Sequence, residues 1–294
     1  MNVLGIIPAR GGSKGIPRKN LAVVAGKTLL EWAVLSARGT RLSRLVVSTD
    51  DQAIGAEATR LGVEVLWRPS ELAQGERVPG SSSTFRACRY HVEQMDVKPD
   101  AVMVLQPTCP LREPADVDAA IERMEATRCE MVVSFAPLKG AYVERVASIN
   151  PRNNAAYSPV KCDRFAPRQD LVPLYVRSGD VYLIKTNWLL AGRECDEEDT
   201  DTRAIVIPAH RYLNIDTPND LAEADRRLRA NQCEHPEVPI MLRTMANDFE
   251  SGEVKDVHYA AEFEHPRIPT IDGDWDLPLT GQRTLEVRYR KVPA

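Results

Sequence analysis

The stretch that decides the fold reads VLGIIPARGGSKGIPRKN and runs from Val3 to Asn20. Its first five residues, which end at Ile7, are apolar and rich in β-branched side chains, and this composition predicts a buried β-strand. Glycines and cationic side chains follow at once, namely Gly11, Gly12, Gly15, Arg10, Lys14, Arg18 and Lys19. In α/β proteins ligands bind at the carboxyl ends of the strands, so we expect this loop to lie in a ligand site.

A loop of this composition is suited to phosphate. Glycine lets backbone N–H groups converge on an anion with no Cβ in the way, and Arg and Lys neutralise the charge of a triphosphate. The loop matches neither G-x-x-x-x-G-K-[ST] nor G-x-G-x-x-G, which excludes a kinase-type P-loop and a dinucleotide fingerprint. The sequence therefore predicts a nucleotide site of another class.

Beyond this loop, short β-branched runs alternate with amphipathic stretches. This alternation is typical of a mostly parallel sheet with helices on both faces, so we predict an α/β fold. The expected strands are residues 3–7, 45–48, 63–67, 101–105, 131–135, 179–184 and 204–207. The expected helices are residues 29–37, 51–61, 83–93, 114–126 and 219–230.

Two segments break this alternation. Residues 136–177 lose all periodicity and are too long for a simple loop in a compact domain, so we interpret about 137–177 as an insertion with a function of its own. Beyond residue 231 frequent prolines argue against long helices, although the alternation at 257–263 is compatible with a strand. We assign residues 1–234 to the main domain and 235–294 to an extension of unknown role.

The composition excludes several classes of protein. The 294 residues include 38 Lys+Arg and 42 Asp+Glu, which is typical of a globular protein and argues against nucleic-acid binding. No apolar run approaches the roughly 20 residues that span a bilayer, and the N-terminus lacks a signal-peptide pattern, so we expect a cytoplasmic protein without membrane association. The six cysteines are widely spaced and are expected to be reduced.

Seven motifs occur in order between residue 1 and about residue 230. They are IPARGGSKGIPRKN (7–20), VVSTDD (46–51), WRPSELA (67–73), LQPTCPLR (105–112), APRQ (166–169), SGDVYLI (178–184) and NIDTPNDL (214–221). Together they resemble the acylneuraminate cytidylyltransferases, the CMP-sialic acid synthetase family. The resemblance implies a three-layer Rossmann-like nucleotidyltransferase fold with a mixed, mostly parallel sheet, and a homodimer to which the insertion at about 137–177 contributes. It also implies transfer of CMP from CTP to a nonulosonic, sialic acid-like sugar acid with release of pyrophosphate.

The resemblance also implies roles for residues around the nucleotide. It assigns CTP binding to Arg10, Gly11, Gly12, Ser13, Lys14, Asn20, Arg68, Ser81 and Gln106, and catalysis to Arg10, Lys14, Lys19 and Asp216. Lys14 and Lys19 would meet the charge that grows on the departing pyrophosphate. A structural salt bridge is the alternative for Arg68. Ser81 has two neighbouring serines that fit the family position equally well, and a helix N-cap is its alternative.

Asp216 is the candidate metal ligand. A carboxylate after a late strand can share Mg²⁺ between the protein and the triphosphate oxygens. The family often has a second Asp two residues earlier, where this chain has Asn214. An amide oxygen can still coordinate a metal, but it contributes no charge.

On the acceptor side, the resemblance points to Gln106, Arg168, Gln169, Ser178 and Tyr182. Arg168 would reach across the dimer and bind the sugar's carboxylate with its guanidinium, with a salt bridge inside the insertion as the alternative. Core packing is the alternative for Tyr182. Ser178 stands where the family more often has Asn, which bears on the identity of the sugar acid.

Two other functions remain open from the sequence. One is a related nucleotidyltransferase that acts on an eight-carbon ulosonic acid or a sugar 1-phosphate. The other is a nucleotide-binding protein without catalysis, for which Asn214 and Ser178 are the indications. No side chain stands out as the general base of the transfer.

Overall fold

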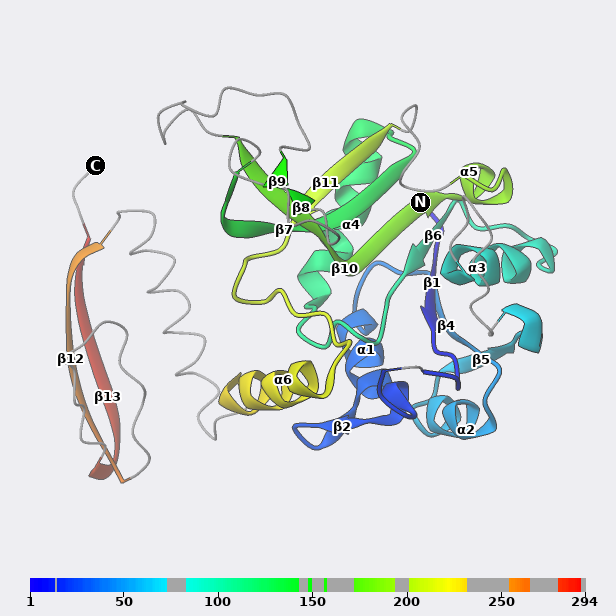
Figure 1. The fold of residues 1–294 in the computed structure, drawn as a ribbon. Helices are drawn as coiled ribbons and strands as arrows, with labels where there is room; N and C mark the ends of the chain where they lie inside the picture. Colours follow the sequence, from blue (N-terminus) through cyan, green and yellow to red (C-terminus); the bar gives the residue numbers. More distant parts are fainter. Residues whose placement is uncertain are drawn as a thin grey trace. The chain divides into compact units, whose positions relative to one another are not determined.

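The computed structural model describes the chain in nine stretches (Figure 1). They are residues 1–13, 15–72, 83–142, 148–149, 156–157, 172–193, 201–231, 254–264 and 280–291. The chain divides into two compact units, residues 1–228 and 229–294. The domain boundary expected at residue 234 lies outside the described residues and stays a prediction.

The first unit is built on a seven-stranded sheet with the order β11-β7-β10-β6-β1-β4-β5. Its strands are β1 (Val3–Pro8), β4 (Arg44–Thr49), β5 (Glu64–Trp67), β6 (Ala101–Val104), β7 (Met131–Tyr142), β10 (Pro173–Lys185) and β11 (Thr202–Val206). Strand β10 runs antiparallel to both β6 and β7, whereas the other neighbouring pairs are parallel. The predicted mixed, mostly parallel sheet is confirmed.

Helices cover both faces of this sheet, as the sequence predicts. They are α1 (Leu29–Ala37), α2 (Gln52–Arg60), α3 (Ser83–Glu93), α4 (Pro114–Thr127), α5 (Thr186–Leu190) and α6 (Pro218–Asn231). Successive side chains of β1 point to opposite faces of the sheet. Ile7 packs in the cluster with α1, α2 and α4, and Ile6 packs in the cluster with α3 and α5. Figure 1 shows α3 and α5 beside each other. The result is the expected three-layer α/β/α arrangement.

Local chemistry explains where these helices begin. The Thr28 hydroxyl accepts a hydrogen bond from the Glu31 amide at the start of α1. The Asp51 carboxylate accepts from the amides of Ala53 and Ile54 at the start of α2. Pro114 is the first residue of α4. A backbone N–H at this position would have no partner inside the helix, so a proline, which lacks one, fits there. These caps explain why α1, α2 and α4 begin within one residue of the expected positions, whereas the short helix α5 was not expected.

The ends of the expected insertion differ from the prediction. Strand β7 continues to Tyr142, and β10 begins at Pro173, so two long paired strands replace the irregular chain that we expected at both ends. A short pair, β8 (Ser148–Ile149) and β9 (Ala156–Tyr157), lies within the insertion. The alternation of apolar residues did not reveal these extensions, because they depend on pairing between residues far apart in the sequence.

The remaining elements are small or belong to the second unit. Residues around the glycine-rich loop form η1 (Lys19–Leu21) and the short pair β2 (Val23–Val24) and β3 (Lys27–Thr28), and η2 (Ser70–Leu72) follows β5. In the second unit β12 (Val254–Glu264) pairs antiparallel with β13 (Thr280–Lys291), which confirms the strand expected at 257–263. Every helix in the described part of the chain is too short or too polar to cross a bilayer.

Candidate active site

The glycine-rich loop, residues 9–20, follows β1 and is fixed at both ends. The Gly11 amide donates to Asp50 Oδ1 at 3.2 Å, which ties the loop to the end of β4. At its other end the buried Asn20 side chain donates through Nδ2 to the Arg10 carbonyl at 2.9 Å. Asn20 therefore closes the loop on itself. Lys14 lies outside the described residues, and its role stays a prediction.

Two of the loop glycines are required by close neighbours. A Cβ on Gly15 would lie 2.7 Å from the Asp216 carbonyl oxygen, and a Cβ on Gly11 would lie 2.7 Å from Asp51 Oδ2. Gly12 has open space at the same position. The loop thus needs glycine at residues 11 and 15 in order to fit against the protein, while Gly12 leaves its backbone accessible to a ligand.

Lys19 joins the loop to the turn that precedes α6. Its Nζ donates to the Ile215 carbonyl at 2.7 Å and lies 3.1 Å from Asp216 Oδ1. The Asp220 carboxylate holds the same turn by accepting from the amides of Asp216 and Thr217, and these bonds lower the pKa of Asp220. The turn therefore presents Asp216 next to the glycine-rich loop, as the sequence predicts.

The donor set at this turn fits a magnesium ion that is held mostly by substrate. The Asp216 side chain is 68% exposed, and its Oδ2 accepts from Asn214 Nδ2 at 3.2 Å. Within the described ranges there is no group of three or more His, Cys, Asp or Glu residues that could hold a metal. Mg²⁺ in nucleotide sites commonly uses one or two protein carboxylates and takes its other ligands from phosphates and water. One exposed carboxylate meets that requirement.

Arg68 lies behind the loop in a buried ion pair. Only 8% of Arg68 is exposed, and its guanidinium lies 3.6 Å from Asp50 Oδ1, the atom that also accepts from Gly11. Burial lowers the pKa of Arg68, the Asp50 charge opposes this shift, and the charge of Arg10 adds to it. The structural salt bridge that we considered for Arg68 is present, and its contact with the nucleotide stays a prediction. Asp50 lies in the VVSTDD motif, but its contacts with Gly11 and Arg68 were not predicted from the sequence.

A buried histidine lies beneath this pair. His91 Nε2 is 2.7 Å from the Ser48 hydroxyl, which lies on β4. Burial, followed by the Arg68 charge, lowers the pKa of His91 to about 4. His91 is therefore neutral at physiological pH and does not add to the positive charge around the loop.

Three motifs meet on the other side of the site. Gly179 lies at an irregularity in β10 between Arg177 and Tyr182, with a φ of +83°. A Cβ at Gly179 would lie 3.1 Å from Gln106 Oε1 and 3.3 Å from Cys109 Sγ. The Cys109 thiol is in turn 4.0 Å from Asn214 Oδ1. The residues after β6, the middle of β10 and the turn before α6 therefore share one edge of the sheet.

The two β10 side chains expected to contact the sugar are used inside the protein. Ser178 is 1% exposed, and its hydroxyl donates to Ser134 Oγ at 2.8 Å. Tyr182 packs edge-on against Phe85 with ring centroids 5.9 Å apart, which is the core packing that we considered as its alternative. Direct sugar contacts by these residues stay predictions.

Three further candidates lie outside the described residues, namely Ser81, Arg168 and Gln169. Cys109, by contrast, is described and buried, and burial raises the pKa of its thiol. A thiol with a raised pKa is a poor nucleophile. This agrees with a reaction that proceeds without a covalent enzyme intermediate.

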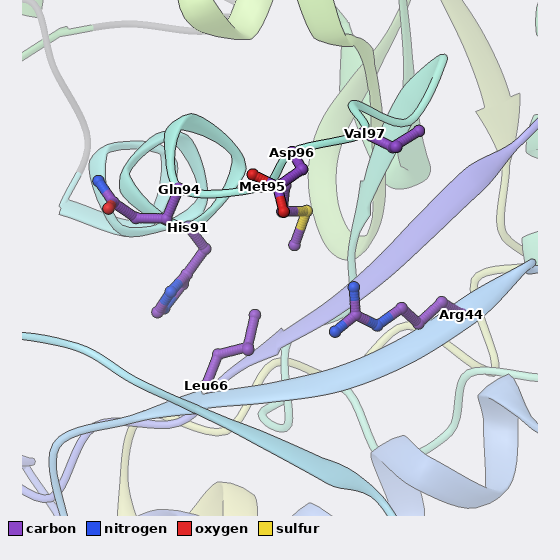
Figure 2. Close-up of a pocket in the computed structure, with 7 residues that line it drawn as sticks. All are labelled: Arg44, Leu66, His91, Gln94, Met95, Asp96 and Val97. Carbon is purple, nitrogen blue, oxygen red and sulfur yellow. The ribbon is translucent and has the colours of Figure 1, made fainter.

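A separate hollow of about 420 Å³ lies beside the end of α3 (Figure 2). Its lining is Arg44, Leu66, His91, Gln94, Met95, Asp96 and Val97. None of the site residues expected from the sequence lines it.

Comparison with known proteins identifies the family. Residues 4–164 match the cytidylyltransferase family. The chain belongs to this family. The motif-based resemblance is thereby confirmed, and this cytidylyltransferase is an enzyme of the acylneuraminate cytidylyltransferase type.

Individual relatives agree with this assignment. The CMP-N,N'-diacetyllegionaminic acid synthase of Legionella pneumophila is 31% identical over 244 residues, which cover 79% of this cytidylyltransferase and 98% of that protein. The N-acylneuraminate cytidylyltransferase of Streptococcus agalactiae is 26% identical over 223 residues, 75% of this chain and 52% of that protein. A solved CMP:2-keto-3-deoxy-manno-octonic acid synthetase in complex with CTP has a TM-score of 0.60 at 18% identity, over 79% of this chain and 100% of that one, and supports the fold.

Proposed function

We propose that this cytidylyltransferase transfers CMP from CTP to the anomeric hydroxyl of a nonulosonic acid and releases pyrophosphate. Family membership and the names of its relatives support the reaction class. The observation that carries the proposal is the contact between Lys19 and Asp216, because it brings a cation of the glycine-rich loop and the candidate metal ligand to one point. The sugar hydroxyl would attack the α-phosphorus in line with the leaving pyrophosphate.

The residues of the loop supply the positive charge that this reaction needs. Negative charge grows on the pyrophosphate as its bond to the α-phosphorus breaks, and fixed cations that meet this charge lower the barrier. Asn20 holds the Arg10 backbone at one end of the loop, Lys19 binds the Ile215 carbonyl at the other, and the Cβ position of Gly12 is open. Mg²⁺ at Asp216 would supply further charge stabilisation at the phosphate oxygens.

The acceptor would lie on the side of Gln106. A neutral amide can both donate to and accept from a sugar hydroxyl. We further propose that Arg168 of the partner subunit binds the sugar's carboxylate. Exposed apolar side chains on or next to the extensions of β7 and β10 support association with a second copy of the chain: Leu138 is 40% exposed, Tyr175 is 49% exposed and Val172 is 55% exposed.

The test is pyrophosphate release with CTP, Mg²⁺ and a panel of acceptors. The panel contains sialic, deaminated sialic, legionaminic and pseudaminic acids and an eight-carbon ulosonic acid. Turnover that requires one of the nine-carbon acids supports the proposal. Turnover with the eight-carbon acid alone would reassign the acceptor, and saturable CTP binding without turnover on any acceptor would contradict the transfer reaction.

Variants then locate the activity in the described site. We expect Arg10→Ala and Asp216→Ala, each shown to be folded, to lose most CTP-dependent pyrophosphate release. Glu64→Ala is the matched control, because it removes an exposed carboxylate that pairs with Arg44. Glu64 is the first residue of β5, at the end of the strand away from the ligand edge. Full activity in both site variants would overturn the assignment of the site.

A further inference from the structure

Arg112, the last residue of the LQPTCPLR motif, is a buried cation that connects three elements. It is 4% exposed, and its Nε donates to the Ser36 hydroxyl on α1 at 2.9 Å. Its Nη1 donates to two carbonyl oxygens, that of Gln106 at 3.1 Å and that of Asp180 at 2.8 Å. One nitrogen therefore ties the residues after β6 to the irregular part of β10.

Burying a charged side chain to connect these elements carries a large desolvation cost. A buried guanidinium loses its hydration, and apolar side chains of similar volume often stabilise a fold as well as a buried ion pair does. What a planar guanidinium adds is direction, because its donors point along fixed lines. The arrangement at Arg112 is therefore better explained by the orientation of its partners than by stability alone.

The partners of Arg112 determine where the Gln106 side chain lies. Gln106 Oε1 would be only 3.1 Å from a Cβ on Gly179, so the amide lies against the backbone of the residue that precedes Asp180. Arg112 Nη1 holds the backbone on both sides of this contact. A change in either hydrogen bond would change the separation between Gln106 and β10.

We infer that Arg112 is a positioning residue that sets the Gln106 amide against Gly179 on the acceptor side of the site, and that the buried charge of Asp180 assists it. Neither Arg112 nor Asp180 needs to touch a substrate for this role. The inference rests on the proposed function only in that it names the acceptor as the ligand next to Gln106.

The surroundings of Asp180 support this role. The residue is 2% exposed, and its Oδ2 has no hydrogen-bond partner among the described residues, as is also true of Arg112 Nη2. Burial raises the pKa of Asp180 to about 6, the Asp116 charge adds to this shift, and a Ser178 hydrogen bond and the charges of Arg112 and Arg211 oppose it. The negative charge of Asp180 also contributes to the raised pKa of Cys109 and of Tyr212. Asp180 should therefore lose its charge as the pH falls below about 6, and the charge interaction between Asp180 and Arg112 should be lost with it.

A double-mutant cycle separates positioning from a purely structural role. We expect Arg112→Lys to lower kcat/KM for the acceptor on the order of 10²-fold, since a displacement of about 1 Å at a reacting site has an effect of that size. In a Gln106→Ala background the same substitution should have almost no further effect, because the side chain that it positions is gone. Equal effects of Arg112→Lys in both backgrounds would overturn the inference.

Arg44→Lys is the control for loss of a guanidinium. Arg44 donates two hydrogen bonds to the carboxylate of Glu64, but this pair is exposed and joins the starts of β4 and β5. We expect no change in acceptor kcat/KM from Arg44→Lys in either background.

Asp180→Asn keeps the inference testable if Arg112→Lys does not fold. The variant removes the charge of Asp180 with little change in shape, so at pH 7.5 it should have the reduced acceptor kcat/KM that the wild type has below pH 6. It should also lack the wild-type decline near pH 6. Wild-type activity together with an unchanged pH profile in Asp180→Asn would contradict a role for the Asp180 charge.

A spectroscopic measurement distinguishes failure of this inference from failure of the proposed function. In ¹H–¹⁵N correlation spectra of the free protein, Arg112→Lys should shift the Gln106 side-chain amide, assigned with Gln106→Ala, and the Gly179 amide. The Gln94 side-chain amide, in the hollow beside α3, should not move (Figure 2). If the wild type turns over no acceptor, the proposed function fails and these shifts still decide the inference. If it turns over an acceptor and the Gln106 and Gly179 signals stay in place, the inference alone fails.

Discussion

Gly15→Ala tests whether the glycine-rich loop is fixed by its contact with the turn before α6. The new Cβ would lie 2.7 Å from the Asp216 carbonyl oxygen, whereas ordinary contact begins at 3.4 Å, so the two segments must separate by about 0.7 Å. Both atoms belong to or adjoin the backbone, so no side-chain rotation relieves the overlap. Overpacking of this kind costs roughly 1–3 kcal/mol. For a unit of this size that corresponds to a fall in Tm of roughly 2–12 °C.

Gly12→Ala is the matched control in the same loop. Its Cβ would meet nothing within 4 Å, so we expect its free energy of unfolding to equal or slightly exceed that of the wild type. The assay is urea unfolding followed by circular dichroism, together with Tm, for both variants. Equal stability of Gly15→Ala and Gly12→Ala would refute the reasoning. Because the displacement also moves Asp216, we expect Gly15→Ala to need more Mg²⁺ for half-maximal pyrophosphate release than the wild type does.

Two further predictions concern charge. Lys19→Met removes an ion pair whose Asp216 partner is 68% exposed, so we expect the free energy of unfolding to change by less than about 1 kcal/mol. We expect kcat to fall on the order of 10²-fold or more, because the cation that meets the leaving pyrophosphate is gone. A large loss of stability with little loss of kcat would contradict this. Burial holds the pKa of His91 at about 4 in the folded protein, below its ordinary 6.5. Between these two pH values the unfolded chain binds more protons at His91 than the folded chain does, so the free energy of unfolding falls as the pH drops from 6.5 to 4. Urea unfolding at pH 7 and 4.5 should show a smaller fall in His91→Gln than in the wild type; an equal fall would exclude His91 as the cause.

Much of the fold follows from local patterns in the sequence. The helices at 29–37 and 83–93 have the expected limits, because apolar residues recur at helical spacing in both, and Thr28 caps the first of them. The strands β1, β4, β5 and β6 were expected to within one residue at either end, since buried parallel strands form short β-branched runs. The direction of β10 and the lengths of β7 and β10 depend on pairing between distant residues, which leaves no local signal.

The candidate site divides in the same way. The glycine-rich loop, Asn20 and Asp216 could be placed from motifs, because the chemistry of phosphate and magnesium calls for particular residue types after strands. Asp50 and Asp180 could not. Each has a partner far away in the sequence: the Asp50 carboxylate accepts from the Gly11 amide 39 positions away, and the Asp180 backbone carbonyl accepts from Arg112 68 positions away. Such pairings leave no local signal in the sequence.

Strand β10 limits how enzymes built on this plan could change their acceptor. The loops after β1 and β6 reach the ligand edge from strand ends, where added or deleted residues leave the ladders intact. Residues 178–182 reach the same edge from within a strand that pairs with β7 on both sides of the irregularity. A single inserted residue there would turn every following side chain to the opposite face of the sheet. We therefore expect new acceptor preferences to arise at 178–182 by replacement of side chains at constant length, because a change of length there would disrupt the pairing of β10.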